Sequence, residues 1–208
     1  MTVVLVINSG SSSFKYQLVD VESQTALASG LVERIGQETG SARHKMGDAD
    51  HTRELPIPDH TAGFRVMLDA FEEYGPSLVE TPPSAVGHRV VQGGARFFRP
   101  TLIDDLVEIN IDELSVLAPL HNPGALQGIR AARAAFPELP HVAVFDTAFH
   151  QTLPPAAYTY AIDQTIAREH RIRRYGFHGT RDKSVSHAPA YHAVSPLAQP
   201  TPRVVTLR

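Results

Sequence analysis

The chain has 208 residues, with 19 lysines and arginines against 22 acidic residues, so its formal net charge is −3. This near-neutral balance gives no electrostatic reason to expect a nucleic acid or an anionic membrane as partner. A hydrophobic content of 42% is typical of a globular chain, and the lack of cysteine excludes disulfides, thiolate catalysis and cysteine-ligated zinc. No apolar run approaches the roughly 18 residues of a membrane-spanning helix, and the N-terminus lacks the basic region of a signal peptide. We expect a soluble, cytoplasmic protein.

Three strands are predicted at the beginning of the chain. Residues 2–7 form a continuous β-branched apolar run, the pattern of a strand that is buried on both faces. A turn of Gly10 and three serines separates this run from residues 14–21, which roughly alternate between apolar and polar, and residues 25–35 form a third candidate strand. Strands in such quick succession indicate an antiparallel meander.

Helices and strands then alternate. Asp59 is a candidate N-cap, apolar residues follow at helical spacing, and Gly75 stands where a C-cap is expected, so we predict a helix between them. A second helix is predicted to begin at Asn122 as its cap, with Pro123 in the first helical position. The other expected elements are an edge strand at 51–58, strands at 85–91, 141–145 and 157–162, and a short helix near 163–170. This order predicts a mixed α/β layered fold.

The end of the chain has a different composition. Four prolines between residues 189 and 202 interrupt any helix or central strand, so we expect irregular structure over 181–202. We therefore divide the chain into a domain at 1–150, the start of a second domain at 151–180, and a Pro-rich tail at 181–208.

A serine-rich turn follows the first strand. Its backbone N–H groups and hydroxyls, including that of Ser12, can cradle phosphate oxygens. Lys15 adds a positive charge, and the side-chain oxygen of Asn8 is a possible ligand for hydrated Mg²⁺. The turn lacks the G-x-x-x-x-G-K-[ST] spacing of a Walker loop. The alternative is an ordinary hairpin turn without a ligand.

Two charged residues stand at the ends of predicted strands. Arg89 presents a planar fork suited to carboxylate or phosphate, and the glycines at 93 and 94 allow close approach of a ligand. Asp146 follows the strand at 141–145, at the carboxyl end where open α/β sheets bind ligands. The alternatives are an ordinary surface arginine and a solvated aspartate that helps to turn the chain.

Two histidines lie beside glycines or a helix start. His121 precedes a predicted helix N-terminus, where unpaired N–H groups attract anions. His178 lies between two glycines and beside Phe177, so it can approach a ligand without steric obstruction. A loop histidine and a structural histidine are the alternatives. A metal hydrolase is disfavoured because no histidine has the H-E-x-x-H spacing of a zinc helix.

Taken together, these motifs resemble the acetokinase family within the sugar-kinase/actin/Hsp70 superfamily. The matching segments are VLVINSGSSSFKYQL, GHRVVQGG, LAPLHNPG, VAVFDTAFHQTLP, YAI and RRYGFHGT, in this order within residues 3–180. The resemblance implies a ribonuclease-H-like mixed sheet with flanking helices and an incomplete second domain. It also implies a homodimer that transfers the γ-phosphoryl of ATP reversibly to acetate, with Mg²⁺, giving acetyl phosphate and ADP.

The resemblance further assigns roles to individual residues. Asn8 would help to bind Mg²⁺, and Ser12 and Lys15 would contact the nucleotide phosphates. The groups that bind the carboxylate or the transferring phosphoryl would be Arg89, His121 and His178, and Asp146 matches the catalytic acidic residue. The apolar pocket for the acetate methyl would consist of Val91, Leu120 and Phe177. Acetate is already ionised at neutral pH, so we interpret Asp146 as orienting substrate or Mg²⁺ rather than as a base.

After Thr180 the resemblance weakens. The family's Gly-rich phosphate loop, its second arginine and its C-terminal metal-binding glutamate have no counterpart in the sequence, so we expect the 208-residue chain not to turn over ATP and acetate by itself. Two alternatives stay open: a propionate or butyrate kinase of the same family, and a non-catalytic fragment that binds carboxylate or phosphate.

Overall fold

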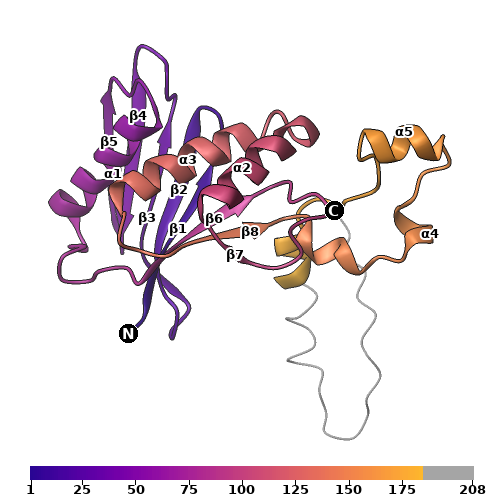
Figure 1. The fold of residues 1–208 in the computed structure, drawn as a ribbon. Helices are drawn as coiled ribbons and strands as arrows, with labels where there is room; N and C mark the ends of the chain where they lie inside the picture. The colour runs from indigo at the N-terminus through magenta and orange to yellow at the C-terminus, as the bar shows by residue number, and fades with distance from the viewer. Residues whose placement is uncertain (185–208) are drawn as a thin grey trace, which may run out of the picture.

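An eight-stranded mixed sheet organises the protein in the computed structural model, which describes residues 1–184 (Figure 1). The strands lie side by side in the order β5-β4-β3-β2-β1-β6-β8-β7. Their bounds are β1 Val3–Ser9, β2 Ser13–Asp20, β3 Thr25–Glu33, β4 Gly40–Met46, β5 Ala49–Leu55, β6 Ala85–Val90, β7 Thr101–Leu102 and β8 His141–Phe145. The labelled α-helices are α1 His60–Tyr74, α2 Asp105–Glu113, α3 Asn122–Ala135, α4 Pro155–Tyr158 and α5 Gln164–Glu169, and two 3₁₀ helices cover Leu114–Leu117 and Ala148–Thr152.

The sheet combines two kinds of strand pairing. Strands β1, β2 and β3 form the predicted antiparallel meander, and β4 and β5 extend it, because each strand pairs antiparallel with the next. Strand β6 then pairs parallel with β1, and β8 pairs parallel with β6. The carboxyl ends of β1, β6 and β8 therefore lie together at one edge of the sheet, where ligands of open α/β sheets bind. This arrangement confirms the predicted mixed α/β fold.

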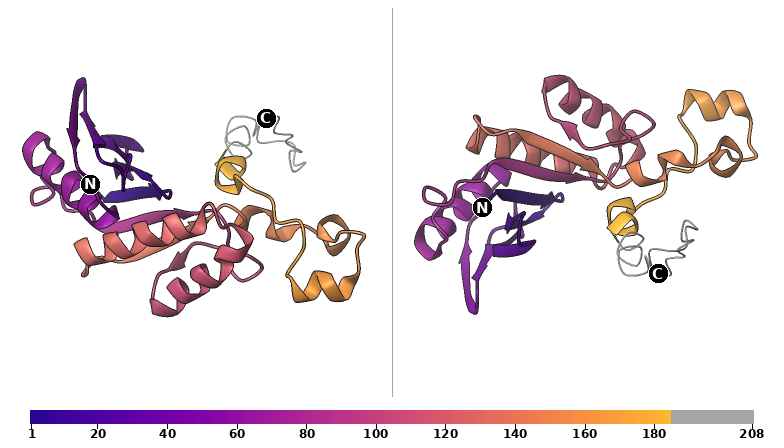
Figure 2. Two further views of the ribbon diagram at one scale, coloured as in Figure 1. Left: turned by 90° about the horizontal axis from the view of Figure 1, so that it is seen from above. Right: turned by 90° about the horizontal axis from the view of Figure 1, so that it is seen from below.

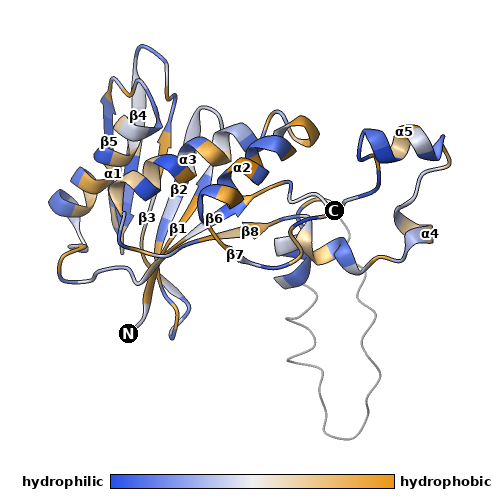
Figure 3. Ribbon diagram, viewed as in Figure 1, coloured by the Kyte–Doolittle hydropathy of each residue, from blue (hydrophilic) through white to orange (hydrophobic). Residues whose placement is uncertain are grey.

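Helices α1, α2 and α3 cover one face of this sheet (Figures 1 and 2). The alternation along β1 explains which face they cover: Val3, Leu5 and Ile7 are buried among helix side chains, whereas Val4 and Val6 point to the other face. Apolar and polar residues alternate along α1 and α3 (Figure 3), and each of these helices has a set of buried residues. Among the described residues, the opposite face carries no long helix.

The ends of α1 follow the local sequence. The Asp59 side chain accepts a hydrogen bond of 2.7 Å from the backbone N–H of Ala62, as a helix N-cap does. At the other end Gly75 adopts φ +79° and its N–H donates to the carbonyl of Phe71. Both predicted caps are confirmed. A side chain at position 75 would be strained in this backbone conformation.

Several predicted elements differ from the structure. The strand predicted at 157–162 is wrong, because α4 ends at Tyr158 and the following residues pair with no strand. The predicted cap of α3 is also wrong: Asn122 is itself helical, and its amide bonds backbone groups elsewhere. The prediction of irregular structure from residue 181 is wrong for 181–184, which are helical, and its remainder lies outside the described residues.

Candidate active site

The serine-rich turn between β1 and β2 is held from three sides. Within the turn, the N–H of Gly10 donates to the carbonyl of Ser13 at 2.8 Å. The His60 imidazole of α1 donates from Nε2 to the carbonyl of Gly10, also at 2.8 Å. Helix α3 touches the turn through Gly124, where a Cβ would lie 2.5 Å from the backbone nitrogen of Ser11. The N-terminus of α3 therefore lies directly against the turn.

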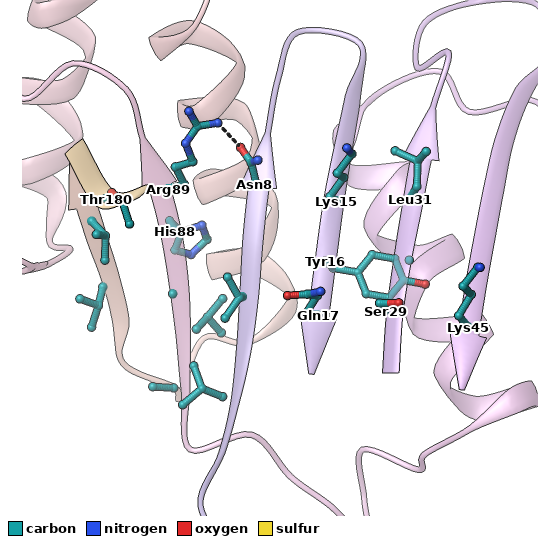
Figure 4. A pocket seen from close by; sticks show the side chains of 18 of the residues that line it. Asn8, Lys15, Tyr16, Gln17, Ser29, Leu31, Lys45, His88, Arg89 and Thr180 are labelled. Atoms are coloured by element: carbon teal, nitrogen blue, oxygen red, sulfur yellow. Dashed lines mark hydrogen bonds between the residues drawn. The ribbon is translucent and has the colours of Figure 1, made fainter. Parts of the chain in front are cut away.

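Arg89 is the centre of a polar network at the carboxyl ends of the parallel strands. Its Nε and Nη2 donate to the same carboxylate oxygen of Asp146, at 3.0 and 2.6 Å. Its Nη1 donates to the side-chain oxygen of Asn8 at 3.3 Å (Figure 4). The Asp146 side chain is only 2% exposed, whereas that of Arg89 is 34% exposed. The structure thus links Asn8, Arg89 and Asp146, which come from three adjacent strand ends.

The second carboxylate oxygen of Asp146 binds a distant part of the chain. Thr180 donates from Oγ1 to this oxygen at 3.0 Å, and the N–H of Gly179 donates to the backbone carbonyl of Asp146 at 2.9 Å. Next to these bonds stands His178, exposed and with φ +58°. Asp146 therefore anchors the glycine-rich segment that carries His178. Thr180 was not recognised from the sequence, because nothing local in the motif shows where its hydroxyl points.

A cavity of about 190 Å³ opens beside this network. It is lined by Asn8, Ser9, Gly10, Ser13, Lys15, Arg89, Val91, His121 and Ala125. The turn, the end of β6 and the start of α3 therefore share one small polar space with two cationic side chains, Lys15 and Arg89. Such a space fits a small anion.

Other predicted site residues lie outside this cavity lining. Ser12 and His178 are exposed, Leu120 is 81% exposed, and Phe177 is 43% exposed. Of the three residues predicted for the apolar pocket, only Val91 lines the cavity. Leu120 and Phe177 do not join it in this structure.

The glycine pair after β6 is fixed by buried polar side chains. Asn122, with 0% exposure, accepts from the N–H of Gln92 and donates to its carbonyl, both at 3.0 Å. Thr147 accepts from the N–H of Gly93 at 2.9 Å. These bonds satisfy buried backbone groups that helix and sheet leave unpaired. Asn122 and Thr147 were not recognised as supporting residues from the sequence, since their partners are far apart along the chain.

Two buried histidines contact each other between strands β6 and β8: His88, which precedes Arg89, and His141. His141 Nε2 is 3.0 Å from the carbonyl of Phe136, so this nitrogen carries the proton and donates. His141 Nδ1 is then an acceptor, and His88 Nε2 donates to it at 3.0 Å. Burial lowers the pKa of His88 to about 3, and burial also lowers the pKa of His141. Both imidazoles are therefore neutral and structural at pH 7.

Two kinds of feature are absent from residues 1–184. No group of three or more histidine and acidic side chains is arranged to hold a metal ion by itself. No helix in this part of the chain is long and apolar enough to cross a membrane.

The chain belongs to the acetokinase family, whose model matches residues 3–202. Curated relatives include "Acetate kinase" of Clavibacter michiganensis subsp. michiganensis, 67% identical over 96% of this chain, and "Acetate kinase" of Leifsonia xyli subsp. xyli, 64% identical over 96%. The chain spans about half the length of these curated relatives. The family match passes Thr180, so the resemblance is longer than the motifs alone indicated.

Solved structures agree with this assignment. The crystal structure of Porphyromonas gingivalis acetate kinase matches with a TM-score of 0.88 and 37% identity, covering 92% of this chain and 49% of that one. A propionate kinase from Francisella tularensis matches with a TM-score of 0.86 and 38% identity, covering 92% and 49%. The fold is therefore the mixed α/β fold of the acetate and propionate kinases, of the actin and Hsp70 type.

Proposed function

We propose that this chain forms the carboxylate- and phosphoryl-binding part of an acetate kinase, which transfers the γ-phosphoryl of ATP reversibly to acetate. The observation that carries the proposal is the Arg89 network. An arginine with one exposed edge, oriented by buried Asp146 and by Asn8, faces a small cavity beside a backbone turn. The family membership supports the same reaction.

The chemistry of phosphoryl transfer fits these residues. A phosphoryl group in flight spreads negative charge over three oxygens, so catalysis consists mainly of positioning and of neutralising that charge. Arg89 and Lys15 supply positive charge at the cavity, and the His121 imidazole can donate a hydrogen bond. In this proposal Asp146 holds the guanidinium of Arg89 in one orientation and takes no proton from acetate, which is already a carboxylate at neutral pH. Val91 borders the acetate methyl group.

The proposal assigns the remaining predicted residues as follows. Ser12 and Lys15 contact the nucleotide phosphates, and His178 stabilises the transferring phosphoryl from the segment anchored on Asp146. Leu120 and Phe177 complete the methyl pocket only if the exposed side chains turn inward when substrate binds. Because ATP is a co-substrate, the proposal places the protein in the cytoplasm. A homodimer is part of the proposal and can be measured by sedimentation.

Magnesium is the metal that the family resemblance implies, and the donor set fits it in part. Oxygen ligands are what Mg²⁺ requires, and it usually takes one or two from protein, the rest from phosphates and water. The side-chain oxygen of Asn8 and a carboxylate oxygen of Asp146 both accept hydrogen bonds from Arg89. These two residues would hold the ion, which would neutralise charge on the ATP phosphates.

A second candidate is a propionate kinase, because a structure of that name matches almost as well as the acetate kinase structure. The two reactions differ only in the space available beside the carboxylate. A purified enzyme that used propionate better than acetate, judged by kcat/KM, would favour this candidate.

The test uses a chimera that joins residues 1–184 of this chain to the remaining half of the Clavibacter michiganensis acetate kinase. Mg-ATP and acetate are supplied, and acetyl phosphate is trapped with hydroxylamine. We expect turnover by the chimera, a loss of about 100-fold or more in kcat for Arg89→Ala, and a smaller loss for Arg89→Lys, which keeps the charge.

Arg133→Ala is the matched control, because Arg133 pairs with acidic residues of α2 away from the cavity. Its kcat is expected to stay within about twofold. Equal activities of the Arg89→Ala and parent chimeras would refute the assigned role. The 208-residue chain, assayed in the same way, is expected to give no acetyl phosphate above a heat-killed sample.

A further inference from the structure

One buried histidine beside the serine-rich turn has no part in the reaction proposed above. His60 is the first residue of α1 and is 6% exposed. Its Nε2 lies 2.8 Å from the carbonyl oxygen of Gly10, 50 positions away along the chain. A carbonyl oxygen only accepts hydrogen bonds, so Nε2 carries the proton and donates. The imidazole therefore joins the start of α1 to the turn that lines the small polar cavity.

This hydrogen bond sets the direction of the peptide group between Gly10 and Ser11. The peptide is trans and planar, so its C=O and its N–H point in opposite directions. Because the C=O points to the imidazole, the N–H of Ser11 points away from His60. Within residues 1–184 this N–H has no hydrogen-bond partner, and Ser11 is exposed. A bound anion can therefore accept a hydrogen bond from it.

The direction of this peptide group needs a restraint, because a glycine precedes it. Glycine tolerates most backbone conformations, so little steric hindrance opposes rotation of the peptide. Helix α3 contacts the same peptide, since a Cβ at Gly124 would lie 2.4 Å from the carbonyl carbon of Gly10. That contact restrains the position of the peptide, but only a hydrogen bond distinguishes its C=O from its N–H. A reversed peptide would present its carbonyl oxygen to a bound anion and repel it.

We propose that His60 is a positioning residue for the anion-binding turn, since it directs the N–H of Ser11 toward phosphoryl oxygens bound there. The inference rests on the proposed function, in which this turn contacts the phosphates of ATP. His60 is not among the residues that line the cavity, so it acts through the carbonyl of Gly10.

A purely structural role is the alternative, and a second histidine provides the comparison. His44 is 1% exposed, and its Nε2 lies 2.7 Å from the carbonyl of Gly75, at the other end of α1. Each of the two imidazoles thus binds a glycine carbonyl from a buried position. Only the carbonyl bound by His60 belongs to the turn beside the cavity.

The first experiment uses the full 208-residue chain, labelled with nitrogen-15, and pyrophosphate as the probe. NMR spectra are recorded as pyrophosphate is added. We expect the amide resonance of Ser11 to move. An anion bound at this N–H polarises the peptide group and strengthens the hydrogen bond at its C=O. The Nε2 resonance of His60 should therefore move as well, whereas that of His44 should stay in place.

Substitutions then separate positioning from stability. His60→Leu removes the donor and should weaken binding of pyrophosphate about tenfold. His60→Gln keeps an N–H donor and should bind within about threefold of the parent chain. His44→Leu is the matched control, because it removes a buried imidazole of the same kind far from the turn, and it should leave binding within about twofold.

Three results would overturn the role of His60 alone. Other amides of the turn move but that of Ser11 does not, the Ser11 amide moves but the Nε2 of His60 does not, or His60→Leu binds pyrophosphate no more weakly than His44→Leu. The first two need no variant, so they decide the question even where a leucine variant fails to fold. If no amide of the turn moves in the parent chain, both this inference and the phosphate contact of the proposed function are wrong.

Discussion

Residues 1–146 and residues 147–184 are built on different physical principles. In the first region two buried clusters of apolar side chains fill the space between the sheet and helices α1, α2 and α3. In the second region Ala167 is the one hydrophobic residue below 10% exposure among those described. Its short helices depend on arginines instead: Arg174 donates to the carbonyl of Ala157, and Arg173 stacks on Tyr158 at 3.7 Å. The first region is held together by its apolar core, whereas the second is held by a few polar contacts, including the hydrogen bond from Thr180 to Asp146 of the first region.

The largest expected effect comes from removing a core ring. Phe145→Ala should lower the free energy of unfolding by about 3–5 kcal/mol, because Phe145 is 2% exposed and stacks on Phe97 with ring centroids 4.3 Å apart. The matched change in the second region is Ile166→Ala, where the side chain is 50% exposed, and we expect a loss below about 1 kcal/mol. Urea denaturation measures both. Equal losses would contradict the distinction between the regions.

A smaller loss is expected for a buried amide. Asn122→Ala should cost about 2 kcal/mol, because it leaves the buried N–H and C=O of Gln92 without partners. Asn110→Ala removes an exposed amide and should change stability by less than about 0.5 kcal/mol. Denaturation midpoints of the two variants, at equal m-values, provide the comparison. A loss of stability in Asn122→Ala as small as that in Asn110→Ala would show that water replaces the buried amide.

Acid should weaken the first region through its histidine pair. The pKa of His88 is about 3 in the folded protein and about 6.5 in the unfolded chain. Burial of the imidazole is the main cause of this lower pKa, and the neighbouring His141 lowers the pKa further. Below pH 6.5 the unfolded chain takes up a proton that the folded chain does not. The stability present above pH 6.5 is therefore lost as the pH falls toward 3, at up to about 1.4 kcal/mol per pH unit for this group. Melting temperatures measured from pH 7.5 to 5 give the dependence of stability on pH. His88→Gln should make this dependence weaker. An unchanged dependence would exclude His88 as its source.

The smallest global effect is expected at the link between the regions. Thr180→Val removes the hydroxyl that donates to Asp146 but keeps the shape of the side chain. We expect global stability to stay within about 0.5 kcal/mol, while protease cleavage within 147–184 becomes faster because local opening is easier. Thr180→Ser should restore the parent cleavage rate. Unchanged cleavage in the valine variant would show that other contacts hold the segment.

The same contrast explains how much the sequence predicted. Continuous apolar runs predicted β1, β6 and β8, and because their ends carry Asn8, Arg89 and Asp146, a shared site could be expected. Strand β4 was missed because its core face consists of Gly40, Ala42 and His44, which form no apolar pattern. Helix α2 was missed because exposed Leu106 and Ile109 blur its helical periodicity.

Other features depend on tertiary contacts. The apolar residues around Tyr158 to Ile162 resemble a strand in sequence, but no neighbouring strand is available to pair with them. The hydrogen bond from Thr180 to Asp146 spans 34 positions along the chain, and no local pattern predicts such a contact. The roles assigned to the individual site residues stay predictions until the chimera is assayed.

The glycines of α3 have a consequence for how this protein can change during evolution or engineering. A Cβ at Gly124 would strike the backbone of Gly10, and a Cβ at Gly128 would lie 2.4 Å from Cβ of Ser9. The turn that lines the cavity therefore packs directly against helix α3. The β1–β2 turn cannot be reshaped without repacking α3, so changes in the shape of the cavity should be confined to its other side, near Val91.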